Sequence, residues 1–567
     1  MANDVELIII GGGMGGSMLA AAMARNGVRV LVLEAGVHPK FSIGESMILE
    51  TSEIMRSIAR VFDVPELEYF SAENFLPAIG TSHGVKRHFS FLPHRAAAQP
   101  DPADLIEAVI PRAPYGHELH IYRQDSDYFL LTTAVRYGAN VLQNKCVEKV
   151  DIGTDGVVVA TTDGEQFSAD YVVDAGGFRS ILATQTNARR YDLRTHTRGL
   201  FTHMTGVEPF PSPQGEGRNG FGVPYALSEG THHHVFDGGW MWIIPFNNHC
   251  ESTNPLCSVG LMLDPQRHPE RADVTADEEF WEFVQRYPAI NAHLNGARPV
   301  REWVRSGRIQ YSSTQSVGDR YCLIGHAAGF IDPLFSKGLY TTLASLFSFG
   351  KTFLQARVDG DFSRARFKTV EQSTLRYVEA NDRLVANALK SFAAPDLWRQ
   401  FSVIWILGAY LELVGLTTYR CLVEKNTGSL EERISYPMPD LSLVGGGYAP
   451  FNDLANFAYE LVEGVASDDE AAMSAAALTL RDRIQAEHWI PYSHREISLG
   501  KRHLPKAKFT ARLFRQKGGP LGDGDFREHF FDGINAVGLA RFLARDARRY
   551  SRKSIARQYR TALKRGI

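Results

Sequence analysis

The stretch Val5-Glu-Leu-Ile-Ile-Ile10, followed at once by Gly11-Gly-Gly-Met-Gly-Gly16, decides the fold of this chain of 567 residues. The six residues from Val5 to Ile10 end in an apolar run, which is typical of a buried strand. A run of small residues from Ser17 to Asn26 predicts a helix, and Val28 to Leu33 predicts a second strand that leads to Glu34. Strand, glycine turn, helix, strand and acid in this order predict the opening of a Rossmann-type unit.

The glycine turn indicates a dinucleotide site. Gly11, Gly13 and Gly16 fit the pattern GxGxxG. In that pattern the first glycine permits the tight turn, the second lets the backbone approach a pyrophosphate, and the third lets helix and strand pack closely. The start of the helix then offers unpaired N–H groups to the phosphates. Glu34 is placed to accept hydrogen bonds from the adenosine ribose hydroxyls.

The rest of the chain divides into a strand-rich part and a helical part. Between about residues 80 and 330, short alternating runs predict strands of the first sheet and of a second, inserted sheet. These runs are Lys86–Leu92, Val157–Thr161, Tyr171–Asp174, His232–Phe236 and Met241–Pro245. Helices are expected from Leu339–Ala356 onward. We therefore predict an α/β core over residues 1–355, with an inserted substrate-side β-sheet, and a helical domain over residues 356–567 that covers the substrate opening.

Composition and charge argue against several classes of protein. The chain is 44% hydrophobic and 22% charged, and its net charge of -3 gives no general attraction to nucleic acid or to an anionic membrane. The five cysteines are scattered without a CxxC pair, which argues against a disulfide framework and a zinc site. A strand begins almost directly after Met1, so we expect no signal peptide and a cytoplasmic location.

Two further segments have ordinary interpretations. The most apolar stretch, Phe401 to Tyr419, is interrupted by Glu412 and is short for a bilayer span, so we predict a buried helix without stable membrane insertion. The segment Arg541 to Ile567 carries ten Lys and Arg residues against one Asp. Charge runs of this kind are usually solvated, so a solvated helix face is favoured over a nucleic-acid contact.

Three segments bear on the choice between NAD and FAD. Arg123, in Tyr122-Arg-Gln-Asp125, is placed to reach a diphosphate. Asp174-Ala-Gly-Gly177 closes a strand with small residues, which allow the backbone to pass close to a cofactor. The segment from Gly325 to Gly338, which includes Asp332, leads into a long helix whose start would place N–H groups beside a reduced flavin or a halide. A tight loop-to-helix turn, explained by packing alone, is the alternative.

Together these segments resemble the flavoprotein monooxygenase fold, and within it the flavin-dependent halogenases. Trp240-Met-Trp-Ile-Ile-Pro245 matches the family signature W-x-W-x-I-P, and Gly44-Glu-Ser46 resembles the family segment near the flavin. Gly84-Val-Lys-Arg-His-Phe-Ser-Phe91 is similar to the segment that bears the essential lysine of phenol-type halogenases, which places that role on Lys86. The resemblance runs from residue 5 to about residue 350 and is nearest to the tetracycline-type halogenases of antibiotic pathways.

The resemblance implies a mechanism. Reduced FAD and oxygen would oxidise chloride or bromide, held near the N–H groups of Lys337 and Gly338, to hypohalous acid. Trp240 and Trp242 would separate the flavin from the substrate, and Lys86 would receive the oxidant and halogenate an electron-rich, phenolic ring. A separate NAD(P)H-dependent flavin reductase would supply reduced FAD, since we see no second nucleotide-binding fingerprint.

The sequence departs from the family at two positions. Phe335 stands where tryptophan-specific halogenases have a glutamate, so the substrate is expected to bring its own ring activation. His326 stands where many relatives have an aspartate that contacts the flavin ribityl chain, so FAD is expected to bind loosely. We assign substrate contacts to Phe335, His83 and Phe89.

The histidine run His232-His-His234 is a weak metal candidate, because adjacent strand residues face opposite sides. We expect no metal site. His83, His88 and His94 surround Lys86 in sequence, and one of them is a candidate base toward a phenol proton. Structural roles are commoner for such residues.

Three alternatives stay open at this stage. An aromatic hydroxylase of the same fold would pass oxygen directly from the flavin and would need neither the tryptophan pair nor Lys86. A flavin-dependent reductase or dehydrogenase acting on a double bond would need no oxygen. A degenerate flavoprotein would serve as a sensor or scaffold. The sequence does not decide the aromatic substrate, its attachment to a carrier, the preferred halide or the oligomeric state.

Overall fold

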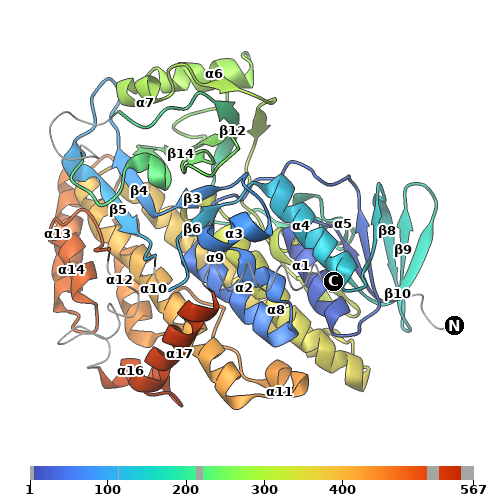
Figure 1. The fold of residues 1–567 in the computed structure, drawn as a ribbon. Helices are drawn as coiled ribbons and strands as arrows, with labels where there is room; N and C mark the ends of the chain where they lie inside the picture. The colour runs from blue at the N-terminus through green and yellow to red at the C-terminus, as the bar shows by residue number, and fades with distance from the viewer. Residues whose placement is uncertain (1–4, 113, 212–220, 507–522, 551–567) are drawn as a thin grey trace.

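A computed structural model describes residues 5–112, 114–211, 221–506 and 523–550 (Figure 1). An eight-stranded sheet forms the nucleotide-binding half, with the central order β19-β20-β10-β1-β2-β7. Its strands are β1 (Val5–Ile10), β2 (Val30–Glu34), β7 (Asn140–Gln143), β8 (Val147–Ile152), β9 (Val157–Thr161), β10 (Gln166–Asp174), β19 (Val317–Gly318) and β20 (Tyr321–Leu323).

The centre of this sheet is parallel, as expected for a Rossmann-type fold. Strand β1 pairs in parallel with β2 on one side and β10 on the other, and β10 pairs in parallel with β20. The carboxyl ends of these strands therefore lie at one edge, where an open α/β sheet binds its ligand. The β8–β9 hairpin extends away from this edge, at the right of Figure 1.

A second sheet has the order β16-β12-β15-β14-β13-β4-β5, with β17 paired to β12. Its strands are β4 (His88–Pro93), β5 (Ile106–Val109), β12 (Arg198–Thr205), β13 (Thr231–Phe236), β14 (Gly239–Pro245), β15 (Cys257–Leu263), β16 (Arg298–Pro299) and β17 (Val304–Ser306). The short pairs β3 (Gly84–Lys86) with β6 (Glu118–His120), and β11 (Arg189–Arg190) with β18 (Ser312–Ser313), stand apart. The predicted fold class, a Rossmann-type core with an inserted sheet, is confirmed.

The predicted continuous strand Lys86–Leu92 is wrong in one respect. The chain breaks at Arg87, so that β3 pairs with β6 while β4 joins the second sheet. The backbone N–H of Arg87 donates to the Glu229 carbonyl and its own carbonyl accepts from Ile110, so this residue bonds outside both ladders. The break leaves Lys86 at the end of β3, on the inner side of the protein.

Helices cover both sheets and fill the C-terminal part. They are α1 (Met14–Arg25), α2 (Leu49–Phe62), α3 (Ala72–Ala78), α4 (Arg123–Arg136), α5 (Ile181–Gln185), α6 (Ala276–Val284), α7 (Pro288–His293), α8 (Lys337–Asp359), α9 (Arg364–Ser391), α10 (Pro395–Asn426), α11 (Leu430–Ser435), α12 (Ala449–Glu463), α13 (Glu470–Ala486), α14 (Tyr492–Ser498), α16 (Gly524–Phe531) and α17 (Ala536–Arg549). Helix α1 packs between α4 and α8, and α8 joins the nucleotide-binding half to the C-terminal helices, orange and red in Figure 1.

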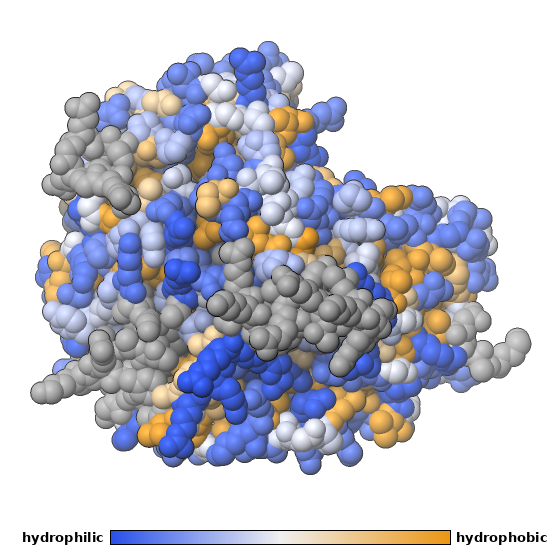
Figure 2. Space-filling view, viewed as in Figure 1, coloured by the Kyte–Doolittle hydropathy of each residue, from blue (hydrophilic) through white to orange (hydrophobic). Residues whose placement is uncertain are grey.

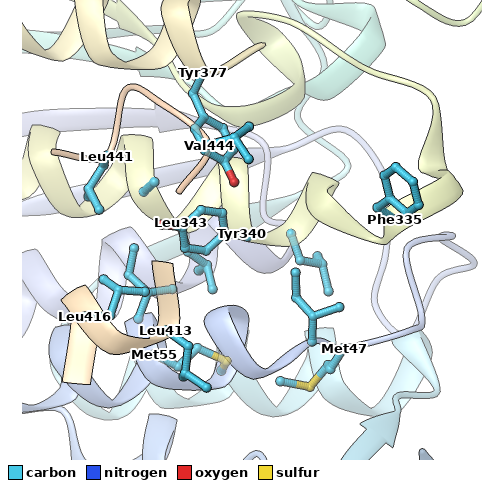
Figure 3. Packing of buried hydrophobic residues seen from close by; sticks show 14 of the residues in the cluster. Met47, Met55, Phe335, Tyr340, Leu343, Tyr377, Leu413, Leu416, Leu441 and Val444 are labelled. Carbon is cyan, nitrogen blue, oxygen red and sulfur yellow. The ribbon is translucent and has the colours of Figure 1, made fainter. Parts of the chain in front are cut away.

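Helix α10 lies at the centre of the C-terminal part. It begins at Pro395, whose missing N–H is not needed because the first N–H groups of a helix have no partner within the helix. It is apolar on nearly all sides, as expected of a helix that is buried all round. By length and hydropathy it would suffice to cross a membrane, but 89% of its most apolar window is buried inside the protein. The predicted buried helix is thus present. Figure 3 shows its residues Leu413 and Leu416 in one cluster with Met55 of α2 and Leu343 of α8.

The basic C-terminal segment is described only as far as residue 550. Within it, Asp546 of α17 is buried and pairs with Arg420 of α10, so this helix is docked on the protein. Residues 551–567 lie outside the described part of the chain. On the face drawn in Figure 2, hydrophobic residues are interspersed with hydrophilic ones.

Candidate active site

The glycine turn after β1 is shaped for a pyrophosphate. A Cβ on Gly16 would lie 2.0 Å from the Gly11 carbonyl oxygen, and one on Gly11 would lie 2.7 Å from the Ala175 carbonyl oxygen, so these two positions require glycine. A Cβ on Gly13 would meet nothing within 4 Å. The space above Gly13 is therefore open, and α1 begins there without a side-chain cap on its first N–H groups. Backbone donors are left for an anion.

Glu34 closes the turn from the end of β2. It is 2% exposed, and its carboxylate accepts hydrogen bonds from the backbone N–H groups of Gly12 and Gly36, both at 2.7 Å, and pairs with Lys40. A buried carboxylate beside the glycine turn fits the ribose of a dinucleotide.

A cavity of about 640 Å³ is lined by strands β13, β14 and β17 of the second sheet, by residues that follow β10 and by the start of α8. Gly44, Glu45 and Ser46 line it on one side, and Gly338 at the start of α8 lines it on another. It is large enough for a flavin ring system with its ribityl chain. Of the residues assigned from the sequence, this one space is lined by Gly44, Glu45, Ser46, Trp240, Trp242 and Gly338. The open Gly13, the uncapped helix and this cavity fit FAD.

Trp240 and Trp242 form a wall of the cavity. They lie two residues apart on β14 and so face the same side of the sheet, with ring centroids 5.6 Å apart. The indole N–H of Trp240 donates to Asp332 at 3.2 Å, and that of Trp242 donates to Ser258 at 3.1 Å. Gly260 on β15 makes room for Trp242, since a Cβ there would lie 1.9 Å from the indole. Both rings are thus held in fixed orientations.

Lys86 is fully buried beside this cavity. Its ammonium nitrogen donates to the Ser46 hydroxyl at 2.6 Å and to the Met47 carbonyl at 2.9 Å, and it lies 3.2 Å from the centroid of the Phe89 ring. Burial lowers the pKa of Lys86 well below its usual value, although Glu118 and Glu50 oppose this effect. A lysine in this setting gives up its proton more readily than an exposed one.

A second, smaller pocket of about 80 Å³ is lined by Phe89, whose ring Lys86 contacts. Phe89, Phe335 and Trp405 form its aromatic walls, and the Phe335 and Trp405 rings stack with centroids 4.6 Å apart. Glu50 contributes a carboxylate to an otherwise largely apolar lining. Ser46 lines the larger cavity and Phe89 lines the smaller pocket, so Lys86 contacts one lining residue of each space.

Comparison with known proteins identifies this arrangement. The tryptophan halogenase family profile matches residues 92–384, and a profile of the NAD(P)-binding Rossmann-like domain matches residues 9–43. The chain is 40% identical over 483 residues to monodechloroaminopyrrolnitrin halogenase PrnC of Pseudomonas fluorescens, covering 84% of each chain. The chain belongs to the flavin-dependent halogenases.

Two further relatives support this assignment. The halogenase is 39% identical over 494 residues to tetracycline 7-halogenase of Kitasatospora aureofaciens, covering 86% of this chain and 87% of that one. The crystal structure of halogenase PltM in complex with phloroglucinol and FAD superposes with a TM-score of 0.83 at 31% identity, over 88% of this chain and all of PltM. FAD and a halide are therefore its cofactor and co-substrate, and the hydroxylase alternative is not favoured.

The start of α8, which follows the turn Pro333–Phe335, is anchored by a buried ion triad. Ser336 adopts a left-handed conformation with φ of 56°, and α8 begins at the next residue without a side-chain cap. The Lys337 side chain leaves the cavity and donates to Glu50 of α2 at 2.7 Å and to Glu412 of α10 at 2.6 Å. Burial alone would lower the pKa of Lys337, but the two carboxylates raise it. Lys337 thus fixes the loop through its side chain.

Three residues assigned to the cofactor have protein partners. Arg123 binds both carboxylate oxygens of Asp127, at 2.7 and 2.8 Å. It also donates to the carbonyls of Ile43 and Gly44 and so holds the loop of residues 42–46 that lines the cavity. Asp174 accepts from the N–H groups of Gly176 and Leu182 and from the Ser180 hydroxyl. Gly325 donates its N–H to the Ser345 hydroxyl. Their cofactor contacts stay predictions.

Asp332 acts on the tryptophan wall. It is buried, and besides the Trp240 indole it accepts a hydrogen bond from Thr197 at 2.6 Å and from the Leu334 N–H at 3.1 Å. Burial raises the pKa of Asp332 to about 6, which these three donors partly oppose. No partner of Asp332 was predictable from the sequence, because the indole comes from a strand 92 positions away.

The histidines are distributed over both faces of the second sheet. His233 lines the cavity and stacks on Phe91 with centroids 4.3 Å apart, whereas His232 and His234 point to the opposite face. There His234 bonds to His94 at 2.8 Å and to His293 at 3.1 Å. Within the described residues, no group of three or more His, Cys, Asp or Glu side chains is arranged to hold a metal ion.

His83 and His88 are structural in their contacts. His83 packs against Phe75 and His249, with centroids 4.5 and 5.1 Å apart, and does not belong to the described lining of the small pocket. His88 bonds to the Ala226 carbonyl at 2.9 Å. Burial lowers the pKa of His83 to about 3 and that of His88 to about 4, so both are neutral near pH 7.

Sequence reasoning missed several residues of the site. Helices that carry no family motif bring Glu50 and Trp405 to the small pocket and Glu412 to Lys337. Glu412 gave the clearest signal, because a carboxylate inside an apolar helix needs a buried cation as its partner.

Proposed function

We propose that this halogenase transfers oxidised halogen from the flavin cavity through Lys86 to an aromatic ring held in the small pocket. The observation that carries the proposal is that the fully buried Lys86 contacts Ser46, which lines the cavity, and Phe89, which lines the small pocket. FAD, held by the glycine turn and the cavity, would supply the oxidising chemistry that converts halide to hypohalous acid. Every other role falls to residues of the chain.

The proposed halide site is the start of α8. Gly338 lines the cavity there, and the first N–H groups of the helix, those of Lys337 and Gly338, have no side-chain cap. Such groups favour an anion through hydrogen bonding and the helix dipole. Trp240 and Trp242 would keep the organic substrate away from the flavin, so that a small oxidant has to travel to Lys86.

The proposed substrate is an electron-rich single ring such as a phenol or an aniline. The pocket of about 80 Å³ is smaller than the cavity of about 150 Å³ known to hold benzene, so binding requires a small outward movement of its walls. Phe89, Phe335 and Trp405 would stack on the ring, and Glu50 would accept its O–H or N–H hydrogen. A proton leaving the ring substituent raises the electron density at the ring carbon.

Helices α10 and α14 supply one side of this pocket through Trp405, Leu413 and His494. This supports a covering role for residues 356–567, which we propose as the second domain after a core of residues 1–355. We propose in addition that a separate NAD(P)H-dependent flavin reductase supplies reduced FAD, and that the protein acts in the cytoplasm.

The test is product formation by wild type and Lys86→Met. Protein, FAD, a flavin reductase with NADH, air, chloride, bromide and a simple phenol are combined, and products are analysed by mass spectrometry. We expect a halogen isotope pattern with wild type and a loss of at least 100-fold with Lys86→Met, while oxygen consumption by reduced flavin persists. Normal halogenation by the variant would refute the role of Lys86, and a product that gains only oxygen would indicate a hydroxylase.

A further inference from the structure

A continuous chain of hydrogen bonds leads away from Lys86. Its ammonium donates to the Ser46 hydroxyl at 2.6 Å, Ser46 lies 2.8 Å from the Thr231 hydroxyl, and Thr231 lies 2.9 Å from Nε2 of His120. The far nitrogen of His120, Nδ1, lies 2.8 Å from the Pro245 carbonyl oxygen. The four side chains come from separate segments of the chain, and each is at most 7% exposed.

The direction of these bonds follows from their ends. The Pro245 carbonyl accepts only, so Nδ1 of His120 carries the hydrogen and Nε2 of the neutral ring accepts. The Thr231 hydroxyl therefore donates to His120, the Ser46 hydroxyl donates to Thr231, and Lys86 donates to Ser46. Each group both accepts and donates in the same sense along the chain. This is the arrangement that a proton needs to pass from one end to the other.

We propose that Ser46, Thr231 and His120 form a proton relay that sets the protonation state of Lys86. This proposal rests on the proposed role of Lys86 and deepens it. In one direction the Lys86 ammonium gives a proton to Ser46, Ser46 gives its own to Thr231, and Thr231 gives its own to Nε2 of His120. The result is a neutral Lys86 amine and a protonated His120, and the reverse sequence restores the start.

Burial is the reason that Lys86 needs such a path. It is fully enclosed, so its proton can leave only along a hydrogen bond to a neighbouring group. Of its two hydrogen-bond partners in the described chain, the Met47 carbonyl has no proton to pass on, whereas the Ser46 hydroxyl has one. A lysine that meets a halogen oxidant must be neutral to attack it and protonated to donate a hydrogen bond, so both roles require control of this proton.

The charged surroundings keep the transferred proton mobile. Glu118 and Glu50 face Lys86, and His83, His88 and Lys86 itself face His120. Burial and the nearby Lys86 lower the pKa of His120 to about 3. Once Lys86 has lost its charge, its effect on His120 disappears, but burial still disfavours a proton there. The relay therefore holds the proton at His120 briefly and returns it. Glu118 is itself held by Ser52 and by the charge of Arg56, which separates it from this exchange.

Two substitutions separate a relay from a structural role. His120→Gln keeps an acceptor for Thr231 and a donor for Pro245 but cannot take up a proton. Thr231→Val keeps the volume and removes the middle hydroxyl, and Thr231→Ser restores that hydroxyl. Thr374→Val is the matched control, because the Thr374 hydroxyl is equally buried and has no hydrogen-bond partner in the described chain.

We expect His120→Gln and Thr231→Val to lower kcat for halogenation at least 10-fold without a matching rise in KM for the phenol. The pH profile should shift by at least one unit, and free hypohalous acid should accumulate. Thr231→Ser should recover to within about threefold of wild type. FAD affinity, measured separately because Ser46 and Thr231 line the cavity, should be unchanged in His120→Gln.

A normal kcat and pH profile in His120→Gln would overturn the relay. The same conclusion follows if Thr231→Ser is as impaired as Thr231→Val, because a hydroxyl in place would then be of no use. These outcomes are distinct from failure of the proposed function, which Lys86→Met tests on its own. If Lys86→Met is inactive and both relay variants are normal, the lysine role stands and the relay falls.

Discussion

Replacing Lys337 by Met should destabilise the protein by about 3–5 kcal/mol at pH 8. Lys337 donates to Glu50 and Glu412 at 2.7 and 2.6 Å, and all three side chains are at most 4% exposed. Methionine matches the length of the stem but leaves two buried carboxylates without their cation, and breaking a buried pair in this way has that typical cost. A domain with ordinary stability would remain folded, so the loss is measurable by denaturant unfolding of the apoprotein.

The pH dependence gives the sharper test. Burial already raises the pKa of Glu412, although Lys337 opposes this, and removing Lys337 will raise the pKa further. A carboxyl whose folded pKa lies above its unfolded value makes the folded state bind more protons, so stability falls as pH rises through that range. The deficit of Lys337→Met should therefore shrink between pH 8 and pH 5.5.

Lys351→Met is the matched control on the same helix. Lys351 is buried, and its partners are the Tyr419 hydroxyl and the Tyr436 carbonyl, with no carboxylate. Burial lowers its pKa to about 8, so its charge is disfavoured, and its loss should cost only about 1–2 kcal/mol. Equal losses in the two variants, with equal pH dependence, would refute the account of the triad.

Two further predictions concern the cofactor turn and acid stability. Gly13→Ala should leave the melting temperature of the apoprotein unchanged and weaken FAD binding at least 10-fold in a flavin fluorescence titration, because its Cβ enters open space where a pyrophosphate would pass. Gly16→Ala, whose Cβ would lie 2.0 Å from the Gly11 carbonyl oxygen, should fail to fold normally. Equal behaviour of the two variants would contradict the assignment of the turn to the cofactor. Burial lowers the pKa of His94 to about 3 and of His293 to about 4, so the unfolded chain binds protons below about pH 6.5 that the folded protein excludes. Stability should thus be full above that pH and fall below it by up to about 1.4 kcal/mol per unit for each histidine, and a flat melting temperature from pH 7 to pH 5 would exclude this effect.

The Rossmann half was predictable because its information is local. The strand Val5–Ile10, the glycine turn and Glu34 lie within 30 residues, and each position is required by backbone geometry that the sequence displays directly. The second sheet was predictable as strands, but its pairing was not. The break at Arg87 depends on hydrogen bonds to Glu229 and Ile110, which no nearby residue indicates.

The site was predictable where family motifs mark it. Trp240, Trp242 and Lys86 were chosen by resemblance, and the structure places them around the two spaces, although their catalytic roles stay proposals. The partners that orient them were not visible. The hydrogen bonds between Asp332 and Trp240, between Ser46 and Thr231 and between Thr231 and His120 each span 92 or more positions of sequence, where periodicity and spacing carry no information.

Helix α10 connects two parts of the candidate active site. Trp405 forms a wall of the small pocket, and Glu412 binds Lys337 at the start of α8, the proposed halide site. Glu412 follows Trp405 by seven residues and therefore lies on the same side of the helix. A chimera that takes this helix from another halogenase to change the accepted ring would exchange both contacts at once. Selectivity for the arene and affinity for the halide are therefore expected to be inherited together, and engineering one alone will require substitutions at position 405 that leave position 412 intact.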